Sequence, residues 1–254
     1  MKKLIVGNWK MNPRTSREAK THFLAIKKEA ASCKNADVAL CVPAVYLSEL
    51  SKYSGKTLAL GAQNVSAEKE GPYTGEISAA MLSQYKVRYC IVGHSERRAL
   101  GETNEFINRK IKSLLAARIT PILCVGEKDR EHGMWYLSVV KTQVEECLVG
   151  IPKNLASKIV IAYEPVWALT STKNRRDTTP EECSEMLIYI RKILADKFGH
   201  TAVKSTKVLY GGSADEKSAL GFLSTGTAAG LLPGKASINP KKFGMMLKIT
   251  NSIK

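Results

Sequence analysis

Residues 159–168 read Ile159-Val160-Ile161-Ala162-Tyr163-Glu164-Pro165-Val166-Trp167-Ala168. The first five residues are a continuous apolar run, as expected of a parallel strand that is buried on both faces. Pro165 ends this strand, because proline has no N–H for the sheet and restricts the residue before it. Glu164 is therefore expected at the C-terminal end of a parallel strand, where α/β proteins carry their catalytic groups. The alternative is an ordinary strand that ends in a solvated glutamate, and the rest of the chain has to decide.

A lid is predicted directly after this strand. An apolar segment, Val166-Trp167-Ala168-Leu169, is followed by a polar tip, Thr170-Ser171-Thr172-Lys173. Such a pattern suits a loop whose apolar underside packs on the protein while its tip faces solvent. We expect this loop to be hinged beside Glu164.

The same kind of strand recurs along the whole chain. Apolar, strand-like runs lie at residues 3–7, 37–42, 58–63, 89–93, 120–125, 159–163, 207–210 and 230–232. Eight strands, each followed by a helical pattern and with no linker between them, predict a closed (β/α)8 barrel. Since α/β barrels of about 250 residues routinely form one domain, residues 1–254 are expected to be a single domain. An open doubly wound sheet is the alternative, but the first turn, Gly7-Asn8-Trp9-Lys10, lacks its glycine-rich fingerprint.

Two of the intervening segments carry clear helix signals. One apolar stripe at helical spacing consists of Ala19, Phe23, Ile26 and Ala30. Further along, Thr179-Pro180-Glu181-Glu182 has the form of a capping box with proline at the first helical position. These signals predict amphipathic helices that cover the barrel from outside.

The chain is strongly basic, with a formal net charge of +16. Such a charge suits a polyanionic partner, a basic cellular background or the attraction of an anionic substrate. No run of five Lys or Arg residues occurs, and no aromatic side chains alternate with basic ones as in RNA-binding strands. We therefore expect the charge to be spread over the molecule and expect no specific nucleic-acid partner.

The cysteines and the N-terminus indicate the compartment. The six cysteines form no Cys-x-x-Cys pair and no Cys/His cluster, so neither disulfides nor a zinc site is expected. The N-terminal apolar run is too short for a signal peptide, and no run is long enough to span a membrane. These features predict a cytoplasmic protein that is not a membrane protein.

Polar residues follow the first and fourth strands. Asn8 and Lys10 come after the first strand, where the lysine is either a solvated surface cation or a group that binds an anion in a cleft. His94 lies between the fourth strand and the start of a helix, whose free N–H groups disfavour a positive imidazolium. A neutral imidazole can donate a hydrogen bond to a carbonyl oxygen and to the enediolate that forms from it.

Smaller groups follow the later strands. Cys124 and Glu127 come at the end of the fifth strand, where we expect packing and a supporting carboxylate. Ser213 follows two glycines after the seventh strand, and Gly234-Lys235 follows the eighth. Barrels often bind phosphate with the loops after these two strands, although turns need glycine for other reasons as well.

Six segments together resemble the triosephosphate isomerase family, in order and across essentially the whole chain. They are Asn8-Trp9-Lys10-Met11-Asn12, Thr74-Gly75-Glu76, Val92-Gly93-His94-Ser95-Glu96-Arg97-Arg98, Cys124-Val125-Gly126-Glu127, Ala162-Tyr163-Glu164-Pro165-Val166-Trp167-Ala168 and Tyr210-Gly211-Gly212-Ser213. The resemblance implies the reversible conversion of glyceraldehyde 3-phosphate to dihydroxyacetone phosphate through an enediolate. It implies no metal and no organic cofactor. It also implies a homodimer in which the Thr74-Gly75-Glu76 loop enters the neighbouring subunit.

The resemblance also implies a role for individual residues. Glu164 corresponds to the general base and His94 to the neutral electrophile, a pair for which this family is a standard example of pKa tuning. Lys10 corresponds to the cation that attracts the phosphorylated substrate, with Asn8 as its polar partner and Glu96 as a supporting carboxylate. Substrate contacts are expected from Asn8 and Lys10 and, around the phosphate, from the residues Thr170, Ser213, Gly234 and Lys235.

Three departures from the family pattern concern the phosphate end. The lid tip reads Thr170-Ser171-Thr172 where the family usually has Gly-Thr-Gly, and residues 174–178 make the following segment about three residues longer. The eighth loop reads Pro233-Gly234-Lys235 in place of a glycine pair, and Ala229 stands where an Asp is common. Two alternatives therefore stay open: a catalytically weakened barrel that binds a phosphate ligand or polyanion, and a related aldose–ketose isomerase.

Overall fold

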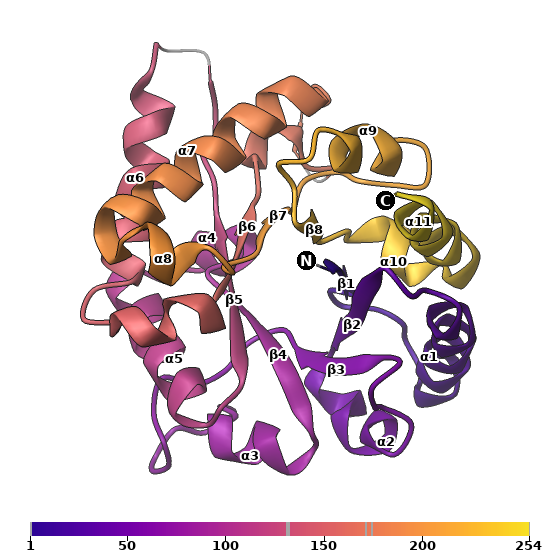
Figure 1. Ribbon diagram of the computed structural model, residues 1–254. Coiled ribbons are helices and arrows are strands. Elements are labelled where there is room, and N and C mark those ends of the chain that lie inside the picture. Colours follow the sequence, from indigo (N-terminus) through magenta and orange to yellow (C-terminus); the bar gives the residue numbers. More distant parts are fainter. Residues whose placement is uncertain (1, 131–132, 171, 174, 254) are drawn as a thin grey trace.

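The computed structural model of the protein describes residues 2–130, 133–170, 172–173 and 175–253 (Figure 1). Ser171 of the lid tip and Asn174 of the lengthened segment lie outside these residues. Eight parallel strands form a closed barrel in which each strand pairs with the next and β8 pairs with β1. The (β/α)8 barrel predicted from the sequence is therefore confirmed, and the open sheet is excluded.

The strands coincide closely with the predicted apolar runs. They are β1 (Lys3–Asn8), β2 (Ala36–Val42), β3 (Ala59–Ala62), β4 (Val87–Val92), β5 (Thr120–Val125), β6 (Val160–Tyr163), β7 (Val208–Tyr210) and β8 (Gly230–Leu231). No strand end differs from the prediction by more than two residues. The agreement follows from burial, because strands covered on both faces need apolar residues throughout.

The helices form the outer layer of the molecule (Figure 1). They are α1 (Ser16–Ala31), α2 (Leu47–Ser51), α3 (Ala79–Gln84), α4 (Ser95–Ala99), α5 (Asn104–Ala116), α6 (Trp135–Cys147), α7 (Pro180–Phe198), α8 (His200–Val203), α9 (Ala219–Ser224), α10 (Lys235–Ile238) and α11 (Pro240–Ser252), with short 3-10 turns η1 (Ala44–Tyr46), η2 (Lys153–Lys158) and η3 (Val166–Ala168). The predicted stripe of α1 is buried. The predicted capping box of α7 is present, with both bonds between Thr179 and Glu182 formed.

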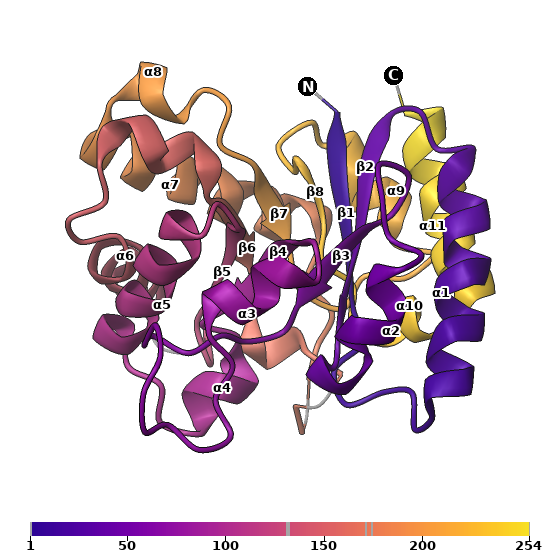
Figure 2. The same cartoon turned by 90° about the horizontal axis from the view of Figure 1, so that it is seen from below.

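The two ends of the barrel differ in which ends of the strands they carry. Because the strands are parallel, all their C-terminal ends lie on one face, here called the strand-end face, and all their starts lie on the opposite, strand-start face. Figure 2 shows both chain termini and α8 towards the strand-start face, and α4 at the other end of the molecule. Catalytic groups of such barrels belong to the strand-end face.

The barrel is filled by side chains. A lumenal cluster to which neighbouring strands contribute includes Leu4, Val6, Ile91, Ile122 and Leu209, all 1% exposed or less. A second, larger cluster lies between the strands and the helices. Within the described part of the chain, no helix is both long and apolar enough to cross a membrane.

Candidate active site

The polar residues predicted at the strand ends line one cavity of about 1280 Å³ on the strand-end face. They come from the ends of β1, β4, β6, β7 and β8 and from the lid, and they are Asn8, Lys10, His94, Glu164, Thr170, Ser213, Gly234 and Lys235. Other predicted residues do not line it: Glu96 pairs with Lys10, Cys124 lies behind Glu164, and the Thr74-Gly75-Glu76 loop is exposed. The cavity therefore joins residues that are far apart in the sequence.

Glu164 follows β6 and is only 3% exposed. Its backbone N–H donates to the carbonyl of Val125 at 2.8 Å, which continues the pairing of β5 and β6 beyond the last strand residue. Gly126 makes this close approach possible, because a Cβ atom at that position would overlap the Glu164 carbonyl. The carboxylate is held by two groups: Ser95 N–H donates to Oε2 at 3.0 Å, and His94 Nε2 lies 2.9 Å from Oε1.

His94 caps the start of α4 with its own side chain. Its Nδ1 atom accepts the backbone N–H of Glu96 at 3.2 Å, so this nitrogen carries a lone pair and no proton. In the neutral ring the proton is then on Nε2, which faces Glu164 and donates to Oε1. The hydrogen bonds thus fit a neutral imidazole with its N–H directed into the site.

Opposing influences set the pKa of Glu164. Burial alone would raise the pKa of this carboxyl, but the positive polarity and hydrogen bond of His94, the Ser95 N–H and the charge on Lys10 outweigh burial. The pKa of Glu164 is therefore below its ordinary value while the carboxylate is bound to these groups. If the carboxylate turns towards a substrate, it leaves both hydrogen bonds but stays buried, so its basicity rises at the moment it is needed.

Lys10 is fixed from several sides. Its φ angle of 52° lies in the left-handed region, which is sterically unfavourable for lysine. Asn8 Oδ1 accepts the Lys10 N–H at 3.0 Å, and Gln63 Nε2 donates to the Lys10 carbonyl at 2.9 Å. The Nζ atom pairs with Glu96 Oε1 at 2.6 Å. Gln63 was assigned no role from the sequence, since its contact with β1 exists only in the folded barrel.

The loops after β7 and β8, where the sequence predicts phosphate binding, form one end of the cavity. Ser213 Oγ donates to the carbonyl of Ala168 at 2.8 Å and so connects the β7 loop to the lid. Gly234 packs on Lys10, where an added Cβ would lie 3.2 Å from Cε, and Lys235 next to it is exposed. Additional cations on the cavity wall that the sequence did not single out include Arg175 and Lys217. The wall is thus suited to an anionic ligand.

The lid is anchored through Trp167, which lies in η3. Its indole N–H donates to Glu127 Oε1 at 2.8 Å, and the same oxygen accepts from the Tyr163 hydroxyl at 2.8 Å. Arg176, from the lengthened segment, lies over the Trp167 ring at 4.1 Å and forms two hydrogen bonds to Glu182 of α7, at 2.9 and 2.6 Å. The extra residues therefore add a contact to the apolar underside of the lid.

The threonines of the lid tip are not strained in this conformation. Among the described residues, non-glycine positive φ angles occur at Lys10, Lys86 and Arg118, so Thr170 and Thr172 lie outside the left-handed region. Any cost of having threonine in place of glycine there would arise only when the lid moves.

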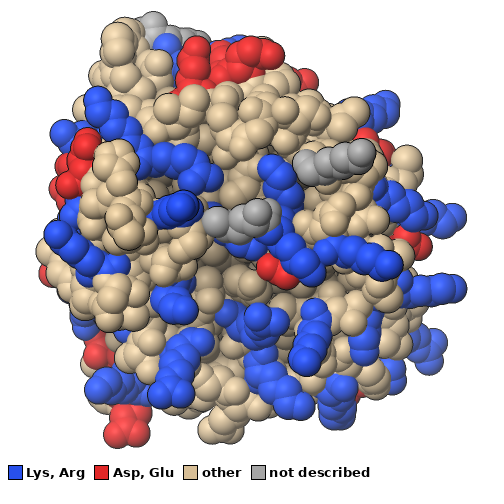
Figure 3. Space-filling model, in the orientation of Figure 1, with Lys and Arg blue, Asp and Glu red and all other residues tan. Residues whose placement is uncertain are grey.

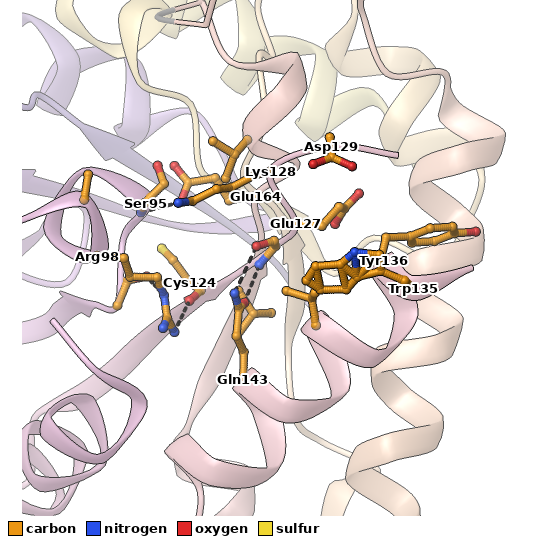
Figure 4. A pocket seen from close by; sticks show the side chains of 16 residues that line it. Ser95, Arg98, Cys124, Glu127, Lys128, Asp129, Trp135, Tyr136, Gln143 and Glu164 are labelled. Atoms are coloured by element: carbon orange, nitrogen blue, oxygen red, sulfur yellow. Dashed lines mark hydrogen bonds between the residues drawn. The ribbon is translucent and has the colours of Figure 1, made fainter. Parts of the chain in front are cut away.

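A second, smaller cavity of about 360 Å³ lies on the other side of Glu164 (Figure 4). It is bordered by Cys124 of β5 and by Trp135, Tyr136 and Gln143 of α6. Burial, and then the nearby charge of Glu164, raise the pKa of Cys124 well above its usual value, so its thiol stays protonated and serves as packing. Among the described residues, no three His, Cys, Asp or Glu side chains are placed to hold a metal ion.

Comparisons with known proteins point to one family. A sequence model of the family described as "Triosephosphate isomerase" matches residues 3–251. The chain is 40% identical over 251 residues to the triosephosphate isomerase of Endomicrobium trichonymphae, covering 97% of this chain and 98% of the relative. It is 44% identical over 246 residues to that of Herminiimonas arsenicoxydans, covering 95% and 96%. The crystal structure of triosephosphate isomerase from Bartonella henselae superimposes with a TM-score of 0.84 at 31% identity, covering 98% of this chain and 99% of that chain.

Proposed function

Since the chain belongs to the triosephosphate isomerase family and interconverts D-glyceraldehyde 3-phosphate and dihydroxyacetone phosphate, we propose that Glu164 is the base that carries the proton between the two carbons. The observation that carries this proposal is the pair formed by Glu164 and the Nε2 atom of His94, 2.9 Å apart in a cavity whose wall also holds Lys10. A base, a neutral donor and a cation are the groups that an enediolate requires.

In the proposed reaction the same three groups serve both directions. Glu164 removes the proton from one carbon of the bound triose and returns it to the neighbouring carbon. His94 directs its Nε2–H to the carbonyl oxygen and moves the proton of the neighbouring hydroxyl group to that oxygen, so that the carbonyl and the hydroxyl group exchange places. Lys10 supplies positive charge beside these oxygens, and the geometry supports this because Asn8 and Gln63 hold its backbone.

We propose that Thr170, Ser213, Gly234 and Lys235 surround the phosphate. Their position at the loops after β7 and β8 and at the lid supports this role, because barrels use these loops for phosphate. Asn8 contributes to binding beside Lys10. Glu96 balances the Lys10 charge before substrate arrives, and Cys124 supports Glu164 from behind by packing.

A homodimer is proposed from the exposed surface beside the site. The loop that contains Thr74, Gly75 and Glu76 is fully exposed in the single chain. Apolar side chains of other segments on the strand-end face are exposed too, with Met11 at 94% and Leu100 at 77%. Exposed apolar side chains around one loop are typical of a surface that another subunit covers.

Two further proposals concern the chain as a whole. Residues 1–254 form one domain, which the single closed sheet supports. The enzyme works in the cytoplasm, in glycolysis and gluconeogenesis, without an organic cofactor; the six free cysteines support a reducing compartment.

The proton-transfer role is tested by running the reaction in deuterium oxide. A carboxylic acid that exchanges with solvent places deuterium on the carbon that receives the proton, so the product should contain carbon-bound deuterium. Product formed without any deuterium would contradict a proton carried by Glu164, because it would indicate direct transfer of hydrogen between the carbons.

A further inference from the structure

The barrel gathers cations that are scattered in the sequence. Eight exposed Lys and Arg side chains lie just before, or at the beginning of, the strands β1 to β7; they are Lys2, Lys34, Lys56, Lys86, Arg88, Arg118, Lys158 and Lys204. We call them the strand-start cations. Because all strands are parallel, these side chains come together on the strand-start face. Figure 3 looks onto this face and shows Lys and Arg spread over it, with most Asp and Glu towards its rim.

Acidic side chains of the described residues do not pair with the strand-start cations. Within the described part of the chain, none of the strand-start cations forms an ion pair, whereas Lys10, Arg130 and Arg176 on the opposite side all do. Asp37, an acidic residue at the start of β2, forms an ion pair with Lys207 at 3.1 Å. Burial lowers the pKa of Lys3, and the nearby positive charge of Arg191 lowers it further. Two cations therefore lie close to each other at this end of the barrel.

Two of the strand-start cations occupy positions that suit glycine. Lys86 and Arg118 each have a φ angle of 58°, in the left-handed region that disfavours residues with a Cβ atom. A cation near the C-terminus of a helix interacts favourably with the helix dipole, and α3 and α5 end just before these residues. That benefit is available at any position of the last helical turn, so it does not account for lysine and arginine at the strained positions.

The strand-start face also offers further hydrogen-bond donors. A shallow hollow of about 480 Å³ lies between η2 and α8, and its lining includes Lys153, Asn154, Ser157, His200 and Ser205. Lysine, amide and hydroxyl groups are the side chains that bind phosphate oxygens along a nucleic-acid backbone.

The apolar side chains argue against a membrane at this face. The most exposed of them, Met11, Val45, Leu100 and Met134, lie in loops that follow strands, on the strand-end face. Stable attachment to a lipid surface needs apolar insertion or a lipid anchor in addition to charge.

We propose that the strand-start face binds nucleic acid through its phosphodiester backbone, independently of base sequence. The eight strand-start cations supply the attraction and the donors of the hollow supply hydrogen bonds. Such binding is electrostatic, so it weakens steeply as salt releases the counterions that drive it. It is separate from catalysis, because the catalytic cavity opens on the opposite face.

The first test compares two variants that lose the same net charge. Arg118→Glu, Lys158→Glu and Lys204→Glu are combined on the strand-start face; Lys128→Glu, Lys141→Glu and Lys241→Glu are combined elsewhere. Binding is followed by the fluorescence anisotropy of a labelled oligothymidylate of about 20 nucleotides, at several salt concentrations. The strand-start variant should bind at least about tenfold more weakly, and its log–log salt slope should fall by about 2 for three lost phosphate contacts. The control variant should lose much less.

The outcomes are decisive. No binding by the wild-type protein at low salt, or an equal loss in both variants, would overturn the proposal, since the second result means that total charge alone matters. Preferential binding of phosphatidylserine vesicles that oligothymidylate cannot displace would also overturn it in favour of a lipid surface. The turnover of the strand-start variant should stay normal and shows that it is folded.

A second variant separates binding from folding. Lys86→Gly combined with Arg118→Gly relieves the strained backbone, so it should raise the melting temperature while it weakens oligonucleotide binding. A purely structural role for these cations predicts a lower melting temperature and unchanged binding, and that result would contradict the proposal.

Discussion

At the scale of single residues, the hydrogen bonds of Glu164 set its chemistry. Ser95 N–H and His94 Nε2 hold the carboxylate in its ionised form and restrain it in one orientation. The same two groups must release it before it can act on a substrate carbon. If Glu164 is the base, as we propose, the resting site keeps it weakly basic, and its basicity rises when substrate draws it away from these two groups.

The titration of Glu164 tests this arrangement. In the free enzyme, the midpoint of its carboxyl carbon NMR signal should lie below the value of about 4.3 of an ordinary glutamate. Because the pKa of Glu164 is lower in the folded protein than in the unfolded chain, its ionised carboxylate stabilises the folded state at pH values above the unfolded pKa. This stabilisation is lost as the pH falls through the folded pKa.

The variant His94→Leu should raise this midpoint, because it removes a lowering contribution and keeps the burial. An unchanged midpoint in a folded His94→Leu protein would show that His94 does not control the carboxylate.

At the scale of elements, local signals were enough to place strands and caps. Pro165 correctly marks the end of β6, and the pattern around Thr179 correctly marks the start of α7. Contacts between elements could not be predicted in this way. The position of Arg176 over Trp167 and the bond from Gln63 to Lys10 depend on how distant segments pack, and no local pattern encodes them.

The Arg176 contact should stabilise the substrate-free position of the lid. A cation at an exposed position over an aromatic ring contributes about 0.5–1 kcal/mol. The Arg176 side chain is such a cation, and its contact exists in the substrate-free position of Trp167. The variant Arg176→Ala should therefore bind glycerol 3-phosphate, a non-reacting triose analogue, about 2–5-fold more tightly if the lid closes on it. Lys141→Ala is the control, since Lys141 is an exposed cation of α6 that pairs with Glu145 and does not line the cavity. Equal or weaker binding by Arg176→Ala would rule out this role.

The lid-tip threonines should matter only on closure. If closure requires positive φ at Thr170 and Thr172, each costs about 1–2 kcal/mol relative to glycine. The double variant Thr170→Gly with Thr172→Gly should then raise turnover and reduce elimination of phosphate from the enediolate, which an incompletely closed lid permits. Kinetics and product analysis measure both quantities. If neither changes, the threonines carry no closure cost.

At the scale of the whole molecule, the barrel was predictable and the distribution of charge was not. Eight buried runs with helices between them define the barrel, because parallel strands must be apolar throughout. Apart from Lys86 and Arg88, successive strand-start cations are at least 22 positions apart in the sequence, as Lys34 and Lys56 are, and only the closed parallel topology brings them to one face.

The proposed homodimer is also a property of the whole molecule. Sedimentation should give twice the chain mass of 27.9 kDa at assay concentration. The variant Thr74→Arg should dissociate the dimer and lose activity, because it places a charge in the loop proposed to enter the partner. Leu220→Arg, at an exposed position of α9, is the control and should stay dimeric. A fully active wild-type monomer would refute the dimer.

The most direct test of the central claim is the turnover of Glu164→Gln in a coupled assay with glyceraldehyde 3-phosphate. Glutamine keeps the size of the side chain and can still accept from Ser95 N–H, but it cannot take up a proton. We expect kcat to fall by about 10²–10⁴ with an unchanged circular dichroism spectrum. Near-normal turnover in the folded variant would contradict the assignment of Glu164 as the base.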